Sequence, residues 1–286
     1  MSVPPAPPAA AIIREDVRRA LAEDFGDGDA TADLLPADAR ATARIVCRED
    51  AVIAGIPWAE ACFRALDASV RIDWRCADGE RVGADATLCE LAGRARTLVG
   101  GERCALNFLQ TLSATATVTA RYVAAVAGTR ATILDTRKTL PGLRLAQKYA
   151  VRCGGGSNHR IGLFDAILIK ENHIAAAGGL DAAVRAARAA HPRLLLEVEV
   201  ESLQELDEAL AAGVDRVMLD DFTPEMLRAA VGRAGGRVPL EVSGGVDLER
   251  VRAIAECGVD FISIGALTKH VHAIDLSMRI GALAPA

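Results

Sequence analysis

Acidic and apolar residues alternate in a predicted strand, LLLEVEV at residues 194–200, and Glu201 continues the series. Successive side chains of a strand point to opposite faces, so Glu197 and Glu199 share one face and apolar residues occupy the other. If the strand belongs to a barrel, helices cover its apolar face and the acids enter the lumen, where an unpaired carboxylate is costly. Such acids require cations, hydroxyl groups or a metal ion. An internal ion pair with Lys170 is the alternative for both acids, and it is favoured less for Glu199, which lies nearer the strand end.

Basic residues cluster between positions 131 and 170. This segment contains seven Lys or Arg and only two acidic residues, although the whole chain has a net charge of −5. A local positive excess in an acidic protein favours a small anionic ligand held in a pocket, and the overall charge argues against a nucleic-acid surface. Three of the seven are spaced by four residues and also fit a solvated helix face; they are Arg144, Lys148 and Arg152. That alternative does not account for Arg137, Lys138 and Lys170, which lie at predicted strand ends.

Polar residues and glycines mark the carboxyl ends of the predicted strands in the second half of the chain. Active sites of α/β barrels lie at these ends. The ends are Asp135-Thr136-Arg137-Lys138, Lys170-Glu171-Asn172-His173, Glu199, Asp220-Asp221, Ser243-Gly244-Gly245 and Gly265-Ala266. The glycines of the last two expose backbone N–H groups that can bind a phosphate. The barrel mouth therefore fits a substrate with a phosphate, further anionic groups and sugar hydroxyls, together with Mg²⁺, which shares phosphate oxygens.

Short apolar segments alternate with helical patterns around these ends. Strands are predicted at 131–135, 166–170, 194–200, 215–219, 238–242 and 259–264. Between them, Thr223-Pro224-Glu225 has the sequence of a helix start, and Gly213 and Gly258 are typical helix ends. Such alternation predicts a parallel sheet with crossover helices. A closed or nearly closed barrel is favoured over an open sheet, because no G-x-G-x-x-G follows the first strand.

The first hundred residues follow a different pattern, which indicates an α+β domain. A helix is predicted at 12–24, and a long helix at 101–127 links this domain to the barrel. Strand segments are predicted at 43–47, 51–54, 70–75 and 87–91. The proline-rich start, residues 1–11, is interpreted as a flexible tail and lacks the basic region of a signal peptide.

Composition limits the class of protein. The chain has 286 residues, of which 51% are hydrophobic and 3% aromatic, so its core must consist mainly of Ala, Val, Leu and Ile. Seven cysteines show no C-x-x-C spacing, and we expect reduced thiols without a disulfide framework or zinc site. No apolar run approaches the ~18 residues needed to cross a bilayer. We therefore expect a cytoplasmic protein that has neither membrane nor nucleic-acid partners.

Eight longer segments between residues 12 and 282 resemble the quinolinate phosphoribosyltransferase family. They are LAEDFGDGDATADLLP, GERCALNFLQTLS, DTRKTLPGLR, GGGSNHRIGLFDAILIKENHI, LEVEVES, VMLDDF, EVSGG and ISIGALTKHVHAIDLSMR. DTRKT combined with GG-x-x-NHR is the most specific feature, whereas the barrel pattern alone is not specific. Ala114 departs from the glycine expected in the linking helix, but it touches no proposed contact.

The resemblance implies a fold and an activity. An N-terminal α/β-sandwich domain at 12–112, joined by 271–286, would accompany an open α/β barrel at 113–270, and the protein would act as a homodimer. The implied reaction transfers a phosphoribosyl group from 5-phosphoribosyl 1-pyrophosphate to quinolinate. Decarboxylation then gives nicotinate mononucleotide, pyrophosphate and CO₂, a step of NAD biosynthesis.

The resemblance also implies individual roles. Arg103 would reach into the partner subunit's site. The quinolinate carboxylates and the pyrophosphate would be held by Thr136, Arg137, Lys138, His159, Arg160 and Lys170. Glu199 and Asp220 would contact ribose hydroxyls and Mg²⁺, and together with Lys138 and Lys170 they are the candidate catalytic residues. The 5-phosphate would be bound by the backbone of Ser243, Gly244, Gly245, Ile264, Gly265 and Ala266.

Three alternatives for the function remain at this point. A family relative, such as those associated with molybdenum transport, would act on a different acceptor. A Schiff-base aldolase would use Lys170 as its nucleophile. A non-catalytic metabolite-binding barrel would explain the phosphate site but not the inward acids. Locally, His159 could instead cap a loop, and Glu171 and His173 could be structural neighbours.

Overall fold

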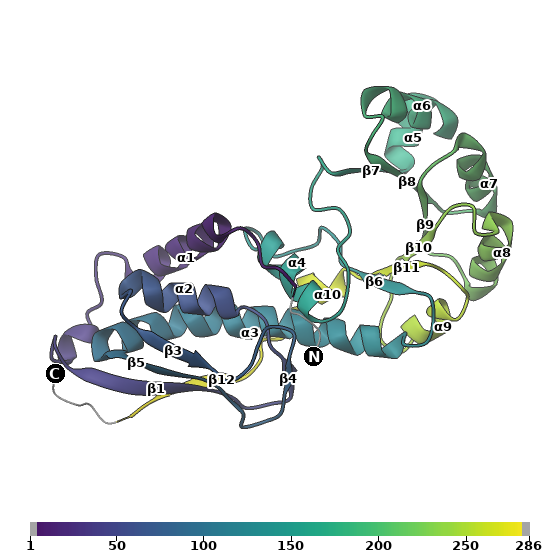
Figure 1. Cartoon of the computed structure of the whole chain (residues 1–286). Coiled ribbons are helices and arrows are strands. Elements are labelled where there is room, and N and C mark those ends of the chain that lie inside the picture. The colour runs from purple at the N-terminus through teal and green to yellow at the C-terminus, as the bar shows by residue number, and fades with distance from the viewer. Residues whose placement is uncertain (1–4, 282–286) are drawn as a thin grey trace. The chain divides into compact units, whose positions relative to one another are not determined.

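The computed structural model describes residues 5–281, which form two units (Figure 1). Unit 1 contains the chain up to residue 120, residues 140–155 and the chain from residue 268 on. Unit 2 contains residues 121–139 and 156–267. Each unit has its own sheet.

Unit 1 is built on a four-stranded antiparallel sheet in the order β12-β1-β5-β3, and β2 pairs separately with β4. Its strands are β1 (Arg40–Cys47), β2 (Ala51–Val52), β3 (Arg71–Trp74), β4 (Arg81–Val82), β5 (Thr87–Arg94) and β12 (Leu276–Ile280). Alternate residues of β1 are buried, because one face of the sheet packs on an apolar core. Trp58, Phe63 and Leu109 of this core are 0% exposed. The last described strand, β12, thus completes a sheet begun near the N-terminus.

Helices cover that core. They are α1 (Ala10–Phe25), the 3-10 helix η1 (Ala32–Leu34), α2 (Ile56–Leu66), α3 (Ala95–Ala125), α4 (Arg144–Cys153) and α10 (Ala266–Lys269), of which α3 and α10 extend across the unit boundary. Helix α2 was not predicted from the sequence, and α3 begins six residues earlier than expected. Helix α1 begins at Ala10, inside the segment interpreted as a tail, and residues 1–4 of that segment lie outside the described chain.

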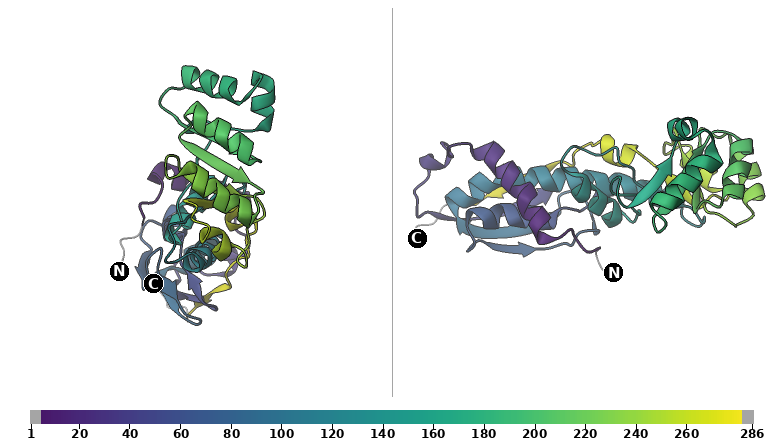
Figure 2. Two further views of the ribbon diagram at one scale, coloured as in Figure 1. Left: turned by 90° about the vertical axis from the view of Figure 1, so that its right-hand side faces the viewer. Right: turned by 90° about the horizontal axis from the view of Figure 1, so that it is seen from above.

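Unit 2 is a curved six-stranded parallel sheet in the order β6-β11-β10-β9-β8-β7, with β6 and β7 at its two edges. Its strands are β6 (Thr132–Leu134), β7 (Ala166–Ile169), β8 (Leu195–Val200), β9 (Arg216–Asp220), β10 (Leu240–Ser243) and β11 (Phe261–Ser263). Its helices are α5 (Glu171–Ala177), α6 (Leu180–Ala190), α7 (Leu203–Ala212), α8 (Pro224–Ala234) and α9 (Val251–Ala255). Figures 1 and 2 show these helices on the outer side of the sheet. The predicted fold class, an open α/β barrel with an antiparallel N-terminal unit, is confirmed.

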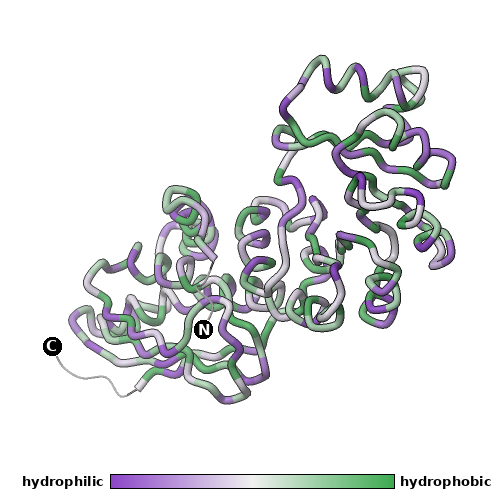
Figure 3. The backbone as a smooth tube through the Cα atoms, turned by 45° about the vertical axis from the view of Figure 1, so that its right-hand side comes forward, coloured by the Kyte–Doolittle hydropathy of each residue, from purple (hydrophilic) through white to green (hydrophobic). Residues whose placement is uncertain are grey.

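Local sequence explains where the barrel helices begin and end. The Ser202 hydroxyl accepts a hydrogen bond from the Glu205 N–H at the start of α7, and Gly213 ends that helix in the left-handed region. Thr223 caps α8 in the same way, and Pro224 occupies its first turn. Figure 3 shows hydrophobic and hydrophilic residues alternating along the helices, as expected for elements with one face on a core.

One glycine of the GGGS segment has a packing role. A Cβ at Gly154 would lie 2.4 Å from the backbone oxygen of Ala116, so only glycine allows the end of α4 to approach α3 this closely. Lys148 on α4 is 2% exposed, which shows that the interpretation of its helix face as solvated is wrong at this position. No helix of the described chain is long and apolar enough to cross a membrane.

Candidate active site

Lys170 and Glu199 form an ion pair at the carboxyl ends of neighbouring strands. Lys170 directly follows β7, and its Nζ binds Glu199 Oε2 on β8. The Lys170 side chain is 43% exposed and the Glu199 side chain is 10% exposed, so Lys170 is the accessible member of the pair. The alternative of an internal ion pair with Lys170 is confirmed for Glu199 and is wrong for Glu197, which pairs with His159. Glu201 is an exposed residue beyond the strand end.

Asp220 adds a second carboxylate at the end of β9. Burial raises its pKa, and the negative charges of Glu199 and Asp221 raise it further, while Lys170 and Lys138 act in the opposite direction. The raised pKa reflects burial first and the neighbouring negative charges second. Two carboxylates at adjacent strand ends offer the oxygen ligands that a hard divalent cation prefers, so Glu199 and Asp220 fit the predicted Mg²⁺.

The glycines predicted to bind phosphate lie against these charged residues. Gly244 has φ +94°, and a Cβ there would be 2.4 Å from Asp221 Oδ1. A Cβ at Gly265 would be 2.9 Å from Lys138 Cδ. Thr136 Oγ1 accepts a hydrogen bond from the Lys138 N–H at 3.1 Å. The loop after β6 therefore meets the loop after β11, and the loop after β10 meets the loop after β9.

Backbone bonds fix the remaining phosphate-site residues. Ser243 pairs in register with Asp220, which aligns the ends of β10 and β9. The Ile264 N–H donates to the Leu134 oxygen at 2.9 Å, and Ala266 begins α10. Gly245 follows with φ +53°. These contacts place the predicted phosphate loops on one end of the sheet.

Arg137 and Arg160 bring two guanidinium groups near each other. Burial lowers the pKa of Arg160, and the positive charge of Arg137 lowers it further, against the opposing charges of Glu197 and Asp165. Arg160 Nη1 also donates to the Ala166 oxygen at 3.4 Å. Adjacent guanidinium groups repel each other and gain from a bound dianion, because each can bind both oxygens of a carboxylate.

His159 lies between two buried carboxylates. Its Nε2 is 2.9 Å from Glu197 Oε2 and 3.4 Å from Glu241 Oε2, and both glutamates are 0% exposed. Arg216 Nη1 is 3.1 Å from Glu241 Oε2, and its guanidinium carbon lies 4.3 Å from the Phe261 ring centroid. The imidazole and the guanidinium thus supply partners to Oε2 of the two carboxylates, whereas Glu197 Oε1 and Glu241 Oε1 are buried without a hydrogen-bond partner among the described residues.

The hydrogen bonds of His159 define its proton position. Burial acts to lower the pKa of His159, whereas the hydrogen bonds to Glu197 and Glu241 act to raise it, because they stabilise a proton on Nε2. Nδ1, however, accepts the Arg160 backbone N–H at 2.7 Å, which requires an unprotonated Nδ1. This bond favours the neutral ring with its proton on Nε2. Both ring nitrogens are thus engaged within unit 2, and contact of the ring with a substrate carboxylate stays a prediction.

The two glutamates differ in the direction of their pKa shifts. Burial raises the pKa of Glu197. For Glu241, burial acts in the same direction, but hydrogen bonds from His159 and Ser263 and the charge of Arg216 bring its pKa below the usual value. The contacts of Glu241 therefore favour its ionised form, and Arg216 is its counter-charge.

Arg216 and Glu241 were missed in the sequence. Alternation places Arg216 and Asp220 on the same face of β9, and it likewise places Glu241 and Ser243 on the same face of β10. The signal was the one used for LLLEVEV, but neither strand has charged residues at successive alternate positions, so the pattern did not stand out. His173 Nδ1 accepts the Lys170 backbone N–H at 3.0 Å, which supports the structural alternative for this histidine.

Arg103 belongs to unit 1 and is exposed on α3. It lines a groove together with residues of the segment between α1 and η1, including Asp29 and Thr31. Asp29 Oδ1 accepts the backbone N–H groups of Thr31 and Ala32, which fixes this segment. The insertion of Arg103 into the site of a second copy stays a prediction.

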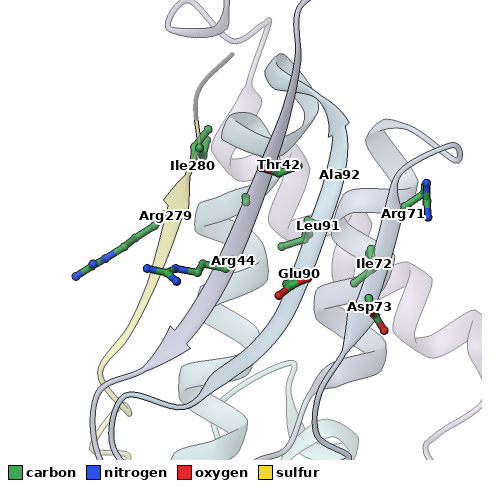
Figure 4. A pocket seen from close by; sticks show the side chains of 12 residues that line it. Thr42, Arg44, Arg71, Ile72, Asp73, Glu90, Leu91, Ala92, Arg279 and Ile280 are labelled. Atoms are coloured by element: carbon green, nitrogen blue, oxygen red, sulfur yellow. The ribbon is translucent and has the colours of Figure 1, made fainter. Parts of the chain in front are cut away.

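A larger groove on unit 1 lies on its antiparallel sheet and contains none of the predicted site residues (Figure 4). Arg44 and Arg71 line it, and so do Asp73 and Glu90. These charged side chains stand on β1, β3 and β5. Charges of both signs on an open sheet face do not define a site for one anion.

Comparison with known proteins identifies both halves of the chain. The family model described as quinolinate phosphoribosyl transferase, N-terminal domain, matches residues 29–113, and the model of the C-terminal domain matches residues 115–279. The chain is 44% identical to nicotinate-nucleotide pyrophosphorylase (carboxylating) of Mycobacterium leprae, over 93% of this chain and 96% of that protein.

Two further relatives agree. The chain is 41% identical to the chloroplastic nicotinate-nucleotide pyrophosphorylase (carboxylating) of Oryza sativa, covering 97% of this chain and 81% of that protein. A solved structure of the nicotinate-nucleotide pyrophosphorylase from Francisella tularensis superposes with a TM-score of 0.94 at 48% identity, covering 98% of this chain and 99% of the other.

Proposed function

Because the chain belongs to the quinolinate phosphoribosyltransferase family, we propose that it transfers the phosphoribosyl group of 5-phosphoribosyl 1-pyrophosphate to quinolinate. Loss of CO₂ then gives nicotinate mononucleotide, a precursor in NAD biosynthesis. The observation that carries this proposal is the convergence of Lys138, Gly265, Lys170, Glu199 and Asp220 at one end of the unit 2 sheet. Cations, carboxylates and glycine loops together match a phosphorylated sugar with a charged leaving group.

The two substrates require different parts of this site. Arg137 and Arg160 bind the quinolinate carboxylates, because a pair of guanidinium groups matches a dianion. Lys138 and Lys170 bind the pyrophosphate. The Thr136 hydroxyl oxygen orients Lys138 by accepting a hydrogen bond from the Lys138 backbone N–H. The 5-phosphate is bound by backbone N–H groups of the loops at Ser243–Gly245 and Ile264–Ala266.

Positioning and electrostatics supply the catalysis. The pyridine nitrogen attacks the C1 atom of the ribose as pyrophosphate leaves, through an oxocarbenium-like state. Glu199 and Asp220 stabilise the developing positive charge and hold the ribose hydroxyls. Once the nitrogen carries ribose, its positive charge stabilises the electron pair that stays on C2 as CO₂ departs, and a proton from water then forms the C2–H bond of the product. No organic cofactor is needed for this loss of CO₂.

Glu199 and Asp220 are the residues that would hold Mg²⁺, since both carboxylates lie at adjacent strand ends and act on each other electrostatically. The ion would neutralise the pyrophosphate charge. Lys170 is ion-paired with Glu199, whereas a Schiff-base aldolase needs a neutral lysine amine. This pairing favours the transferase over the aldolase.

We further propose a homodimer in which Arg103 completes the site of the partner. Its exposure on α3 supports this role. Mixing Arg103→Ala with Lys138→Ala protein should then restore activity, because a mixed dimer contains one site with both residues intact. Mixtures that stay inactive after subunit exchange would contradict the shared site. A cytoplasmic location stays a prediction.

The direct test measures CO₂ and mononucleotide from purified protein with quinolinate, phosphoribosyl pyrophosphate and Mg²⁺. Equal amounts of both products support the proposal. No CO₂ release would count against it, and higher turnover with nicotinate or another base would identify a relative with a different acceptor. A covalent adduct trapped with borohydride would support the aldolase instead.

A further inference from the structure

Glu241 is fully buried in unit 2, and the proposed reaction leaves it without a role. Its carboxylate accepts from two cationic or polar groups at once, His159 Nε2 at 3.4 Å and Arg216 Nη1 at 3.1 Å. Removing the Glu241 carboxylate leaves the Arg216 guanidinium without its counter-charge. This loss is more costly than the loss of one partner from an exposed ion pair on the surface. A buried ionised glutamate of this kind needs a structural or functional reason.

The ring of His159 connects Glu241 to the segment that carries Arg160. While Nε2 faces the glutamates, Nδ1 accepts the Arg160 backbone N–H at 2.7 Å. A rotation of the ring away from Glu241 would therefore break the bond to Arg160. The imidazole acts as a rigid spacer between the buried carboxylates and the backbone of the next residue.

The same segment is tied to the edge strand β6 by its backbone. The His159 N–H donates to Asp135 Oδ1 at 2.9 Å, and Asn158 Nδ2 donates to Asp135 Oδ2 at 2.6 Å. Ser157 forms an isolated parallel bridge with Leu134. The loop between α4 and β7 thus lies along β6. The His159 ring contacts Glu197 of β8 and Glu241 of β10.

Arg160 needs such support because it lies near a like charge. The positive charge of Arg137 acts directly on it, and its guanidinium has one bond of 3.4 Å to a backbone oxygen. Like charges repel, so two adjacent guanidinium groups move apart unless other contacts fix the backbones that carry them. The contacts of His159 fix the backbone of Arg160, and those of Glu241 fix His159.

We propose that Glu241, paired with Arg216, is a positioning residue that holds His159 and thereby sets Arg160 for the carboxylates of the acceptor. This inference rests on the proposed function for the identity of the acceptor. It assigns Glu241 no contact with either substrate. Loss of its charge should therefore weaken binding of the acceptor and leave binding of the phosphoribosyl donor nearly unchanged.

The test compares Glu241→Gln with Glu256→Gln, which makes the same chemical change in an exposed ion pair with Arg252. We expect the KM for quinolinate to rise about tenfold in Glu241→Gln, the effect of one lost hydrogen bond to a charged group. The KM for phosphoribosyl pyrophosphate should change by less than about twofold, and Glu256→Gln should match the wild type. Unchanged quinolinate KM, or equal rises in both KM values, would overturn the inference.

A double-variant cycle separates action through His159 from a general loss of packing. If Glu241 acts through His159, the double variant Glu241→Gln/His159→Gln should have the quinolinate KM of His159→Gln alone. Multiplied effects would show that the two residues act independently and would overturn the inference. If Glu241→Gln does not fold, Glu241→Asp is used instead, because it keeps the charge and shortens the reach to His159. The KM values for quinolinate and phosphoribosyl pyrophosphate are then compared in the same way, with the same expected and contradicting outcomes.

Nitrogen NMR of His159 gives a readout that does not depend on the reaction. The wild type should show the proton on Nε2, and Glu241→Gln should change the shifts of both ring nitrogens. If the wild type shows the proton on Nε2 but has no activity on quinolinate, the proposed function is refuted, while the contacts of His159 with the two glutamates are still supported. His159, Glu197 and Glu241 also place three ligand atoms within 4.8 Å of one another. One metal ion per chain bound by these residues would overturn the positioning role.

Discussion

The interior of unit 1 and the interior of unit 2 are built from different side chains. In unit 1, Trp58, Phe63 and Leu109 are fully buried, and its buried Asp78 is bonded by the Tyr149 hydroxyl and the Ile56 N–H. In unit 2, charged groups on the strands are wholly or largely buried: Glu197, Glu241 and Arg216, together with the ring of His159, which enters from a loop. Apolar burial stabilises a fold, whereas buried charges add little stability and fix positions.

This comparison teaches that the two units have different tolerance to substitution. Changes in the core of unit 1 should reduce the free energy of unfolding and leave the kinetics of the remaining folded enzyme intact. Changes at the strand ends of unit 2 should reduce activity more than stability. Four predictions test this division.

The largest effect is expected for Phe63→Ala in unit 1. Removing a fully buried aromatic side chain should lower the free energy of unfolding by about 3–5 kcal/mol, because a cavity remains. Urea unfolding measures the loss. The matched control is Phe164→Ala in unit 2, where the side chain is 73% exposed and the expected change is within ~0.5 kcal/mol. Similar losses in both variants would contradict the burial seen here.

Glycine-to-alanine changes should affect stability in one unit and activity in the other. Gly101→Ala places a Cβ 2.7 Å from the Phe63 ring, and overpacking should cost about 1–3 kcal/mol of stability with kcat/KM close to wild type. Gly244→Ala places a Cβ 2.4 Å from Asp221 Oδ1. This variant should lower kcat/KM by about 100-fold, since small displacements of groups in an active site are costly. Steady-state kinetics and thermal unfolding of both variants test this contrast.

Gly236→Ala is the control for backbone strain. This glycine has φ +75° and no atom within 4 Å of the added Cβ. The variant should lose stability and keep its activity. A kcat/KM as low as that of Gly244→Ala would show that left-handed strain in unit 2, and not the contact with Asp221, impairs the enzyme.

Arg137 and Arg144 are close in sequence but belong to different units. Arg137→Ala should weaken substrate binding more than Arg144→Ala by at least ~1.5 kcal/mol, the order of one charged hydrogen bond. Titration calorimetry with quinolinate measures both. Equal losses would mean that the anion site is not where Arg137 and Arg160 meet.

The smallest effect concerns the pH dependence of unit 1. Asp67 accepts hydrogen bonds from the Ser69 hydroxyl and from Arg94, which hold its pKa well below the usual range. A depressed pKa contributes stability above the unfolded pKa of about 3.9, and this stability is lost as pH falls below it. Asp67→Asn should therefore be less stable at pH 7 and lose less stability on acidification. Melting curves between pH 7 and 3 test this, with exposed Asp38→Asn as the control.

Much of the fold could be predicted from the sequence because its signals are local. The six strands of unit 2 have the apolar segments expected of them, and Thr223-Pro224 begins a helix as predicted. Helix α2 was missed because its start depends on contacts from elsewhere: Gly55 precedes it in the left-handed region, and Asp78 accepts the Ile56 N–H.

The sequence alone determined which residues are inward-facing or at strand ends, because alternation and loop position are properties of neighbouring residues. Only the tertiary structure decided the partners: Lys170 with Glu199, and His159 with Glu197 and Glu241. The physical reason is that these pairs come from different strands and loops, and the curvature and register of the sheet bring them within hydrogen-bond distance. A buried charge is stable only with such a partner. The local sequence pattern around the charged residue does not identify which residue that partner is.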